Sequence, residues 1–512
     1  SRPASGNPIP SPPLAQAWGF AAAGKQVYSD LEEKMRVLFI AAEATPFAKV
    51  GGLADVVSSL ARALKGMGLQ VAIALPRYLG VEERTSLEEV ARYTVPLGEE
   101  GKECVVYRGQ LPRGDVEVYF LDHPPFFRRP GIYGEGGKEY PDAIARFSFL
   151  SWAGGMLPER LGWVPDIIHI HDWHTALVPV LLHYELVDSA LRDVKVLLTI
   201  HNLAYQGTAP LEQAASTGLP PEATAAITHR GVLNLLYGGI KFAHMVNTVS
   251  PSYAQEILER GEGLEEILRV RAERGELVGI LNGVDYSLWD PATDPHIWAH
   301  YSADDLSGKA INKRRLQEAL GLEVTPDVPL VGMISRLVEQ KGFDLIIPAF
   351  DRMMSLGIQF VVLGTGEPRY EEALRDAASR YPGRVAALIT FSEEWAHRIE
   401  AASDIFLMPS KFEPCGLNQM YSLRYGAVPV VRATGGLKDT VRECDPGSDS
   451  GNGFLFEEYT PEAMLAALKR AVDLYRNDRD AWRRLMVRGM REDHSWEASA
   501  REYVELYRRL KG

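Results

Sequence analysis

Cysteine is scarce in this chain of 512 residues, which contains 3: Cys104, Cys415 and Cys444. None of them belongs to a CxxC pair, so a disulfide framework and a thiolate zinc site are disfavoured and a reducing compartment is expected. No run of about eighteen apolar residues occurs, which gives no support for a membrane span. Positive charge is in deficit, with 55 Lys and Arg against 68 Asp and Glu. The resulting net charge of −13 disfavours nucleic acid and anionic membranes as partners.

Residues 1–34 differ in composition from the rest of the chain. Five prolines fall within the first thirteen residues, and such Pro-rich stretches lack the apolar spacing that builds a core. No basic region precedes a sustained apolar stretch, so a secretory signal is disfavoured. We expect a flexible leader, either a processed remnant or an alternative start, before a natural start at Met35.

Short apolar runs alternate with amphipathic helical stretches from Met35 onward. This alternation predicts an α/β fold with parallel sheets and right-handed crossovers. It restarts after the turn-rich segment 282–295, which indicates two doubly wound domains with a hinge near 280–300. Strands are expected at 36–42, 70–76, 166–172, 195–201, 244–250, 328–335, 358–364, 384–390, 403–409 and 427–433.

The predicted domains are Rossmann-like and cover residues 35–280 and 281–491. A last helix within 492–512 carries an apolar stripe and is expected to pack back on the first domain. Two such sheets that face each other bring the carboxyl ends of their strands to one cleft, where open α/β folds bind ligands.

The segment KVGGLAD, residues 49–55, joins the first strand to its helix. Paired Gly51 and Gly52 at a helix start allow backbone N–H groups to approach a phosphate, and Lys49 adds positive charge. A glycine turn beside a solvated lysine is the alternative. The segment is neither a dinucleotide-binding GxGxxG motif nor a P-loop.

Two cations, Arg336 and Lys341, follow the strand expected at 328–335. Together they are suited to grip the phosphates of a departing nucleoside diphosphate, the alternative being a solvated loop. Glu413, at the end of another strand, is suited to bind sugar hydroxyls or stabilise a cationic sugar, although a Glu-Pro turn is often structural. The segment Thr434-Gly435-Gly436 repeats the pair of glycines at a helix start.

Three histidines in HIHDWH, residues 169–174, suggest a metal site at first sight. No acidic or cysteine ligand completes a usual set, so a metal is disfavoured. Asp478-Arg479-Asp480 matches the DxD pattern that binds metal in some glycosyltransferases, but it lies in a polar helical stretch, which favours a structural interpretation.

Seven segments in order resemble bacterial glycogen synthases and plastid starch synthases, from about residue 35 to 510. They are KVGGLAD, HIHDWH, TIHNLAYQG, LNGVD, SRLVEQKG, SKFEPCGLNQMYSLRYG and TGGLKDTV. The resemblance implies a GT-B fold and transfer of glucose from ADP-glucose to the non-reducing 4-hydroxyl of an α-1,4-glucan with retention. It also implies no metal, pyridoxal phosphate or other cofactor, and a location in the bacterial cytoplasm or the plastid stroma.

The resemblance also assigns roles to individual residues. Arg336 and Lys341 would neutralise the diphosphate, while Glu413 and His171 would complete the catalytic set. The donor would be bound by Lys49, Gly51, Gly52 and Asp55, with Glu43 near the catalytic cleft. Further substrate contacts would come from Asn282, Phe391, Cys415, Gly416, Leu417, Thr434, Gly435 and Gly436.

The sequence departs from the family at two places. Phe391 stands where many members have a tyrosine that stacks on adenine, so stacking is expected without the hydroxyl contact. The segment 257–268 lacks a tyrosine often found there, and altered acceptor contacts are expected. No obvious second carboxylate exists for a double displacement of the kind retaining hydrolases use. Attack by the acceptor on the same face as the leaving phosphate is therefore favoured.

Other functions are less consistent with the motifs. A sucrose- or trehalose-type synthase would share SRxxxxKG but not KVGGLAD with EPCGL, and a glucan phosphorylase would need a lysine bound to pyridoxal phosphate. A Rossmann dehydrogenase is disfavoured because GxGxxG is missing after the first strand. A catalytically inactive glucan-binding protein is disfavoured because every charged position expected to be essential is intact. Product type, primer length, oligomeric state and strictness for ADP- over UDP-glucose are left open.

Overall fold

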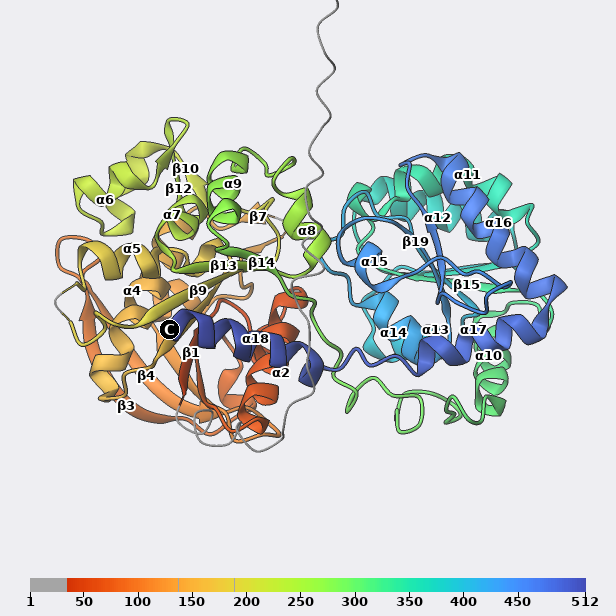
Figure 1. The fold of residues 1–512 in the computed structure, drawn as a ribbon, viewed down its shortest axis with the longest axis horizontal. Coiled ribbons are helices and arrows are strands. Elements are labelled where there is room, and N and C mark those ends of the chain that lie inside the picture. The colour runs from red at the N-terminus through yellow and green to blue at the C-terminus, as the bar shows by residue number, and fades with distance from the viewer. Residues whose placement is uncertain (1–34, 137, 188) are drawn as a thin grey trace, which may run out of the picture.

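The computed structural model describes residues 35–136, 138–187 and 189–512, so the expected leader lies outside the described residues. The elements form two lobes that lie side by side, one from red to green and one mainly from teal to blue (Figure 1). A nine-stranded sheet is the centre of the first lobe and a six-stranded sheet the centre of the second. No described helix is long and apolar enough to cross a membrane.

The first sheet is parallel over most of its width and antiparallel at one edge. Its strands in spatial order are β14 (Leu277–Gly279), β13 (Met245–Thr248), β9 (Lys195–Ile200), β8 (Ile167–His171), β1 (Arg36–Ile40), β2 (Gln70–Pro76), β5 (Glu117–Asp122), β4 (Lys102–Gln110) and β3 (Glu88–Val95). The expected strands in this half are present, with ends shifted by up to two residues. The antiparallel edge β3–β4 differs from the parallel pattern that we predicted, because hairpin strands with one wet face lack the continuous apolar runs of buried strands.

The second sheet is parallel throughout its described pairings. Its strands in spatial order are β17 (Val385–Leu388), β16 (Gln359–Leu363), β15 (Leu330–Ile334), β18 (Ile405–Met408), β19 (Val428–Arg432) and β20 (Phe454–Phe456). From β15, the chain adds β16 and β17 on one side of the sheet and then β18, β19 and β20 on the other side. Such a topological switch point opens a crevice at the carboxyl ends of the strands. Arg336 and Glu413 follow β15 and β18 on this edge.

Helices cover both sheets because each presents an apolar stripe to them. In α2 (Gly52–Gly66), Leu53, Val57, Leu60 and Leu64 recur at helical spacing and are buried. The other helices of the first lobe are α3 (Pro124–Phe127), α4 (Ala143–Leu161), α5 (Leu177–Tyr184), α6 (Pro221–Ala226), α7 (Leu235–Phe242), α8 (Pro251–Glu256) and α9 (Glu265–Glu273). Those of the second lobe are α10 (Ser307–Leu320), α11 (Phe343–Met354), α12 (Pro368–Arg380), α13 (Glu393–Ala402), α14 (Asn418–Tyr425), α15 (Gly435–Thr440), α16 (Pro461–Asn477) and α17 (Arg479–Met490).

Smaller elements complete the lobes. Short pairings form β10 (Thr208–Ala209), β12 (Val232–Asn234) and β11 (Thr228–His229), and β6 (Gly134–Glu135) with β7 (Lys138–Glu139). The 3₁₀ helices are η2 (Val81–Glu83), η3 (Trp173–Thr175), η4 (Leu211–Thr217) and η5 (Glu339–Lys341).

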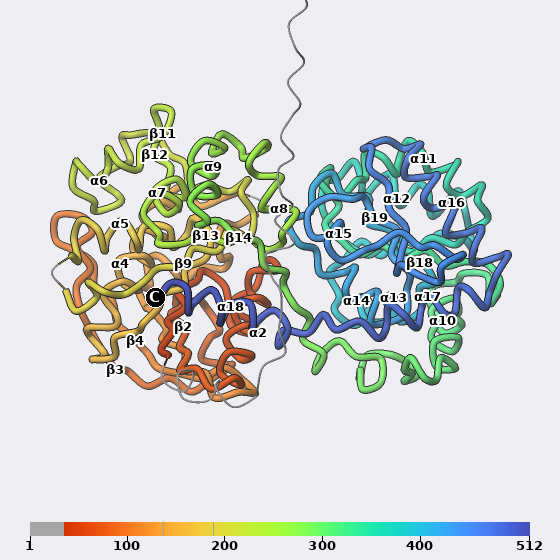
Figure 2. Tube along the Cα trace, viewed as in Figure 1, coloured from red at the N-terminus to blue at the C-terminus, as the bar shows by residue number. Residues whose placement is uncertain are grey.

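The last helix, α18 (Trp496–Lys511), returns to the first lobe, where its trace lies across α2 (Figure 2). Trp496, Tyr503 and Leu506 of the expected stripe are buried in the core of the first lobe. Polar contacts fix the helix as well, since the Tyr507 hydroxyl lies 2.7 Å from Nδ1 of His169 on β8. The expected packing of the last helix is therefore confirmed.

The chain crosses between the lobes twice, and the two crossings lie side by side. The backbone N–H of Val284 donates to the carbonyl of His494 at 2.7 Å. Domain boundaries near 280 and 491 remain our proposal, supported by these crossings and by the separation of the two sheets.

Candidate active site

The turn after β18 places a carboxylate against a lysine. Glu413 Oε2 lies 2.6 Å from Lys341 Nζ and accepts a hydrogen bond of 3.0 Å from the Ser410 hydroxyl. The side chain of Glu413 is 8% exposed and that of Lys341 18% exposed. Two residues predicted to be catalytic therefore meet, although they stand 72 positions apart in the sequence.

The shape of this turn depends on glycines. Gly416 has φ of +73°, in the left-handed region, and a Cβ there would lie 2.6 Å from Oε1 of Gln419. A Cβ on Gly435 would come within 1.9 Å of the Glu413 carbonyl oxygen. Because Gly436 donates its N–H to the carbonyls of Glu413 and Pro414, the Thr434-Gly435-Gly436 segment supports the turn that carries Glu413.

The predicted role of Thr434, Gly435 and Gly436 in binding substrate stays a prediction. The Gly435 N–H donates to Oε1 of Glu256 at 2.8 Å, and the Thr434 hydroxyl faces the same carboxylate. Glu256 ends α8 of the first lobe, so this contact joins the two lobes next to the turn.

Arg336 follows β15 and is exposed. Within the part of the chain that the structure describes, its guanidinium has no ion pair or hydrogen bond, which leaves its planar donor fork free for an anion. The side-chain amide of Asn418 donates to the carbonyl of Ile334 at 2.7 Å and so ties the start of α14 to the end of β15.

A buried carboxylate, that of Glu43, accepts hydrogen bonds from the backbone of the loop before α2. Glu43 Oε2 accepts the N–H groups of Val50 at 2.6 Å and Gly51 at 3.1 Å. Its other oxygen accepts the Tyr133 hydroxyl at 2.5 Å. Burial raises the pKa of Glu43, and these three donors oppose that rise by stabilising the carboxylate.

Lys49 and Asp55 form an ion pair of 2.9 Å at the surface of this loop. Asp55 also accepts the Thr45 hydroxyl at 2.9 Å, so its carboxylate holds Lys49 in place. A Cβ on Gly52 would meet Cδ1 of Leu417 at 3.9 Å. The KVGGLAD and EPCGL motifs, one from each lobe, therefore lie side by side.

His171, at the carboxyl end of β8, is buried and has one free ring nitrogen. Its Nδ1 lies 3.0 Å from Nε2 of His201, while its Nε2 is buried without a partner among the described residues. Burial lowers the pKa of His171 well below its usual range, so the ring is neutral. Buried polar atoms are rarely left unpaired in folded proteins, so this nitrogen is suited to a ligand hydroxyl.

Asn282, in the segment that crosses between the lobes, also has a buried polar side-chain atom, Oδ1, without a partner among the described residues. Its backbone N–H donates to the sulfur of Cys415, and burial nevertheless raises the pKa of that thiol to about 12. Cys415 is therefore a neutral thiol, which disfavours it as a nucleophile.

The other histidines of HIHDWH have different environments. Both ring nitrogens of His169 have a hydrogen-bond partner, the Tyr507 hydroxyl on one and the Thr199 hydroxyl at 2.6 Å on the other. The ring of His174 stacks on Tyr133 with the centroids 5.0 Å apart. No group of three or more potential ligands that could hold a metal ion occurs among the described residues. In the DxD pattern, Asp478 caps α17 by accepting the Ala481 N–H, which gives it a structural role.

Three residues beside the site escaped the sequence analysis as individual candidates. They are Tyr133, Asp172 and His201. Asp172 has φ of 57° and ψ of −172°, a strained conformation for a residue other than glycine, and its carboxylate accepts the His201 N–H at 2.7 Å. His201 and Asp172 lie in quoted motifs, whereas no local signal points to Tyr133, which reaches Glu43 from 90 positions away.

Phe391 lies in the turn between β17 and α13, on the same edge of the second sheet as Arg336. Its side chain is 86% exposed. A solvent-facing ring of this kind is suited to stack on a base, although its predicted contact with adenine stays a prediction.

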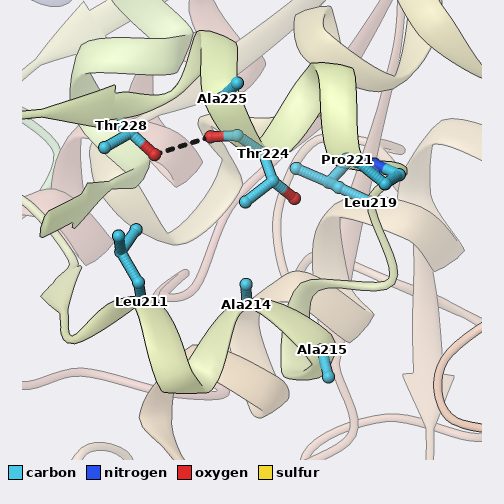
Figure 3. A pocket seen from close by; sticks show the side chains of 8 residues that line it. All are labelled: Leu211, Ala214, Ala215, Leu219, Pro221, Thr224, Ala225 and Thr228. Carbon is cyan, nitrogen blue, oxygen red and sulfur yellow. Dashed lines mark hydrogen bonds between the residues drawn. The ribbon is translucent and has the colours of Figure 1, made fainter.

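A surface groove of about 640 Å³ lies elsewhere, between η4 and α6 (Figure 3). Its lining is mostly apolar, and none of the predicted site residues contributes to it. The residues around it are Leu211, Ala214, Ala215, Leu219, Pro221, Thr224, Ala225 and Thr228. It carries no titratable group, so we do not place chemistry there.

Comparison with known proteins identifies the family of the chain. Residues 36–270 match the family described as the starch synthase catalytic domain, and residues 321–484 match glycosyl transferases group 1. A glycogen synthase of Anaeromyxobacter dehalogenans (strain 2CP-C) is 48% identical over 482 residues, covering 93% of this chain and 100% of the relative. A glycogen synthase of Thermotoga petrophila is 43% identical over 486 residues, again covering 93% of this chain and 99% of the relative.

Solved structures agree with these relatives. The catalytic domain of starch synthase IV from Arabidopsis thaliana, bound to ADP and acarbose, superposes with a TM-score of 0.85 at 39% identity. The alignment covers 93% of this chain and 99% of that one. A sucrose-phosphate synthase from Thermosynechococcus elongatus, at 19% identity and a TM-score of 0.57, shares the fold alone. The chain has the GT-B fold and belongs to the glycogen and starch synthase family of glucosyltransferases.

Proposed function

We propose that this protein transfers glucose from ADP-glucose to the 4-hydroxyl at the non-reducing end of an α-1,4-glucan, with retention of configuration and release of ADP. The observation that carries the proposal is the meeting of Lys341 and Glu413 at the edge where KVGGLAD and EPCGL are in contact. Arg336 follows β15 on the same edge, and its guanidinium has no partner among the described residues. The glycogen synthases among the relatives support the reaction, and the neighbour solved with ADP supports the donor.

The cations would act on the leaving group. As the bond from C1 of glucose to the β-phosphate oxygen breaks, negative charge grows on ADP. Arg336 and Lys341 would oppose that charge from fixed positions. The N–H groups of Val50 and Gly51 are already bound to Glu43, so the further partial positive charge near this phosphate would come from the start of α2 at Gly52. No metal or organic cofactor is required in this scheme.

The sugar would be held by neutral and anionic groups. Glu413 would contact the glucose hydroxyls. Nε2 of His171 and Oδ1 of Asn282, which have no partner in the described part of the chain, would each bind a sugar hydroxyl. The acceptor oxygen would form its bond to C1 on the face that ADP leaves. Its proton would pass to the departing phosphate oxygen, so that every atom is accounted for and no enzyme nucleophile is needed.

The remaining residues of the predicted set would shape the donor site. Lys49 and Asp55, as an ion pair, would fix the entrance, and Phe391 would stack on adenine. The close approach of Gly52 to Leu417 would complete the wall between the two lobes. We also place the protein in the bacterial cytoplasm or the plastid stroma, which the bacterial origin of the relatives and the plant origin of the neighbour support.

The test is release of ADP from ADP-glucose with and without glycogen, beside UDP-glucose and with EDTA present. We expect release that depends on glucan, persists in EDTA and is faster with the adenine donor. Folded protein that releases no nucleotide from either donor, yet still binds glycogen, would favour a binding protein instead. Loss of release in EDTA that Mg²⁺ restores would refute the metal-free scheme.

A further inference from the structure

Exposed aromatic rings are rare in this protein. Among the Phe, Tyr and Trp residues of 35–136, 138–187 and 189–512, only Tyr205 and Phe391 are largely exposed, at 57% and 86%. Each follows a strand at the carboxyl-end edge of its sheet, Tyr205 after β9 in the first lobe and Phe391 after β17 in the second. Loops on this edge carry the ligands of open α/β folds, so both rings lie where function is expected.

The loop that carries Tyr205 begins inside the candidate site. His201 directly follows β9, contacts His171 and donates its N–H to Asp172. Tyr205 is four residues further on, so its Cα lies at most about 14 Å from that of His201. The ring is exposed at the surface and close enough to meet a ligand that extends from His171.

The loop is held by hydrogen bonds to other segments, whereas the Tyr205 ring has no polar or ring partner among the described residues. Leu203 is buried and donates its N–H to the Tyr253 hydroxyl at 3.1 Å. The amide of Gln206 donates to the carbonyl of Glu262 at 3.1 Å and accepts from Asn234 at 2.7 Å. In contrast, the Tyr205 side chain makes no hydrogen bond, ion pair or ring contact with any described residue. A fixed backbone that exposes an unused aromatic ring is typical of a binding platform.

The ligand that suits this platform is a sugar polymer. The C–H faces of a glucose ring are apolar and flat enough to lie on an aromatic ring, while its hydroxyls stay in water. A glucan chain whose end reaches the pocket must continue over the surface, unlike the compact donor. We propose that Tyr205 stacks against a sugar ring of the α-glucan acceptor, outside the pocket that holds the transferred glucose. This proposal deepens the proposed function and rests on it.

The experiment compares Tyr205→Ala, Tyr205→Phe and Tyr205→Trp in the full chain. We expect Y205A to raise the glycogen concentration for half-maximal rate by about fivefold and to reduce retardation in native gels containing glycogen. The KM for ADP-glucose and the rate at saturating glycogen should stay within about twofold. Y205F and Y205W should behave like the unaltered protein, because stacking needs the ring and not the hydroxyl.

Two control variants separate this role from general damage. Phe391→Ala removes the other exposed ring, and it should raise the KM for ADP-glucose while leaving gel retardation unchanged. Leu211→Ala removes an exposed apolar side chain from the surface groove and should change neither quantity.

The outcomes distinguish the proposal from the proposed function. Unchanged glycogen dependence and retardation in Y205A, with the reaction intact, would overturn the role of Tyr205 alone. Equal losses in Y205F and Y205A would overturn stacking in favour of a hydroxyl contact. If the unaltered protein transfers no glucose yet Y205A weakens retardation, the reaction is refuted and the platform is supported.

Discussion

Replacing Lys341 with alanine should separate the chemistry from the binding of glucan. The change removes the cation that lies 2.6 Å from Glu413 and that we place against the departing diphosphate. In a site that excludes most water, loss of one such fixed electrostatic contact costs about 10²- to 10³-fold in kcat, or roughly 3 to 4 kcal/mol of transition-state stabilisation. The affinity for glycogen should change by less than about twofold, because no part of the acceptor depends on that charge.

The same substitution also affects stability. Among the described residues it leaves the carboxylate of Glu413, whose side chain is 8% exposed, with the Ser410 hydroxyl as its remaining hydrogen-bond partner. Losing a partner of a largely buried charge costs on the order of 1 to 3 kcal/mol of unfolding free energy. The double variant K341A/E413Q removes the charge that was left unpaired, so it should recover stability but not turnover. This difference separates the ion pair as a structural contact from the lysine as a catalytic group.

The assay is initial-rate ADP release at saturating glycogen, with native gels in glycogen for binding and urea unfolding for stability. Lys341→Arg serves as the matched control, since it keeps the charge but changes its shape, and an intermediate rate is expected. A loss of kcat smaller than tenfold would refute the assigned role. So would a loss of glycogen affinity as large as the loss of kcat.

Three further predictions follow from the buried polar groups. Glu43→Gln turns two charge-assisted hydrogen bonds to the loop at Val50 and Gly51 into neutral ones, so kcat/KM for ADP-glucose should fall by about tenfold with the glycogen dependence unchanged; an equal effect on both substrates would contradict the loop's role. Burial raises the pKa of Asp172 to about 7, so its contribution to stability is fully present below its unfolded pKa near 4 and is lost as pH rises to 7. The unaltered protein therefore loses stability as pH rises from 4 to 7, whereas Asp172→Asn does not lose this contribution. The melting temperature of the variant minus that of the unaltered protein should increase across this range, and a constant difference would count against the raised pKa. Tyr507→Phe leaves Nδ1 of the buried His169 unpaired and should lower the unfolding free energy by about 1 to 3 kcal/mol, as seen in urea titrations, with kcat retained; an unchanged midpoint would show that the contact is unimportant.

The sequence was most informative where the signal was local. Strands buried on both faces, such as β1 and β18, are nearly continuous apolar runs, so their positions and the α/β class were predictable. The apolar stripe of α18 predicted its return to the first lobe, since a stripe of that width must be covered. The antiparallel edge at β3 and β4 was not predicted, because its alternation of buried and exposed residues is weaker than a continuous run.

The motif residues were also identifiable from the sequence, because their types and spacing fit phosphate and sugar chemistry. What only the tertiary structure decided is which of them meet and which are already satisfied. It pairs Lys341 with Glu413 and gives both ring nitrogens of His169 a partner. Within the described ranges, it leaves the Arg336 guanidinium and one ring nitrogen of His171 without a partner. Spacing along a chain fixes neither contacts between distant loops nor the water they exclude. Those contacts arise when two sheets, each folded from its own local pattern, bring the carboxyl ends of their strands together.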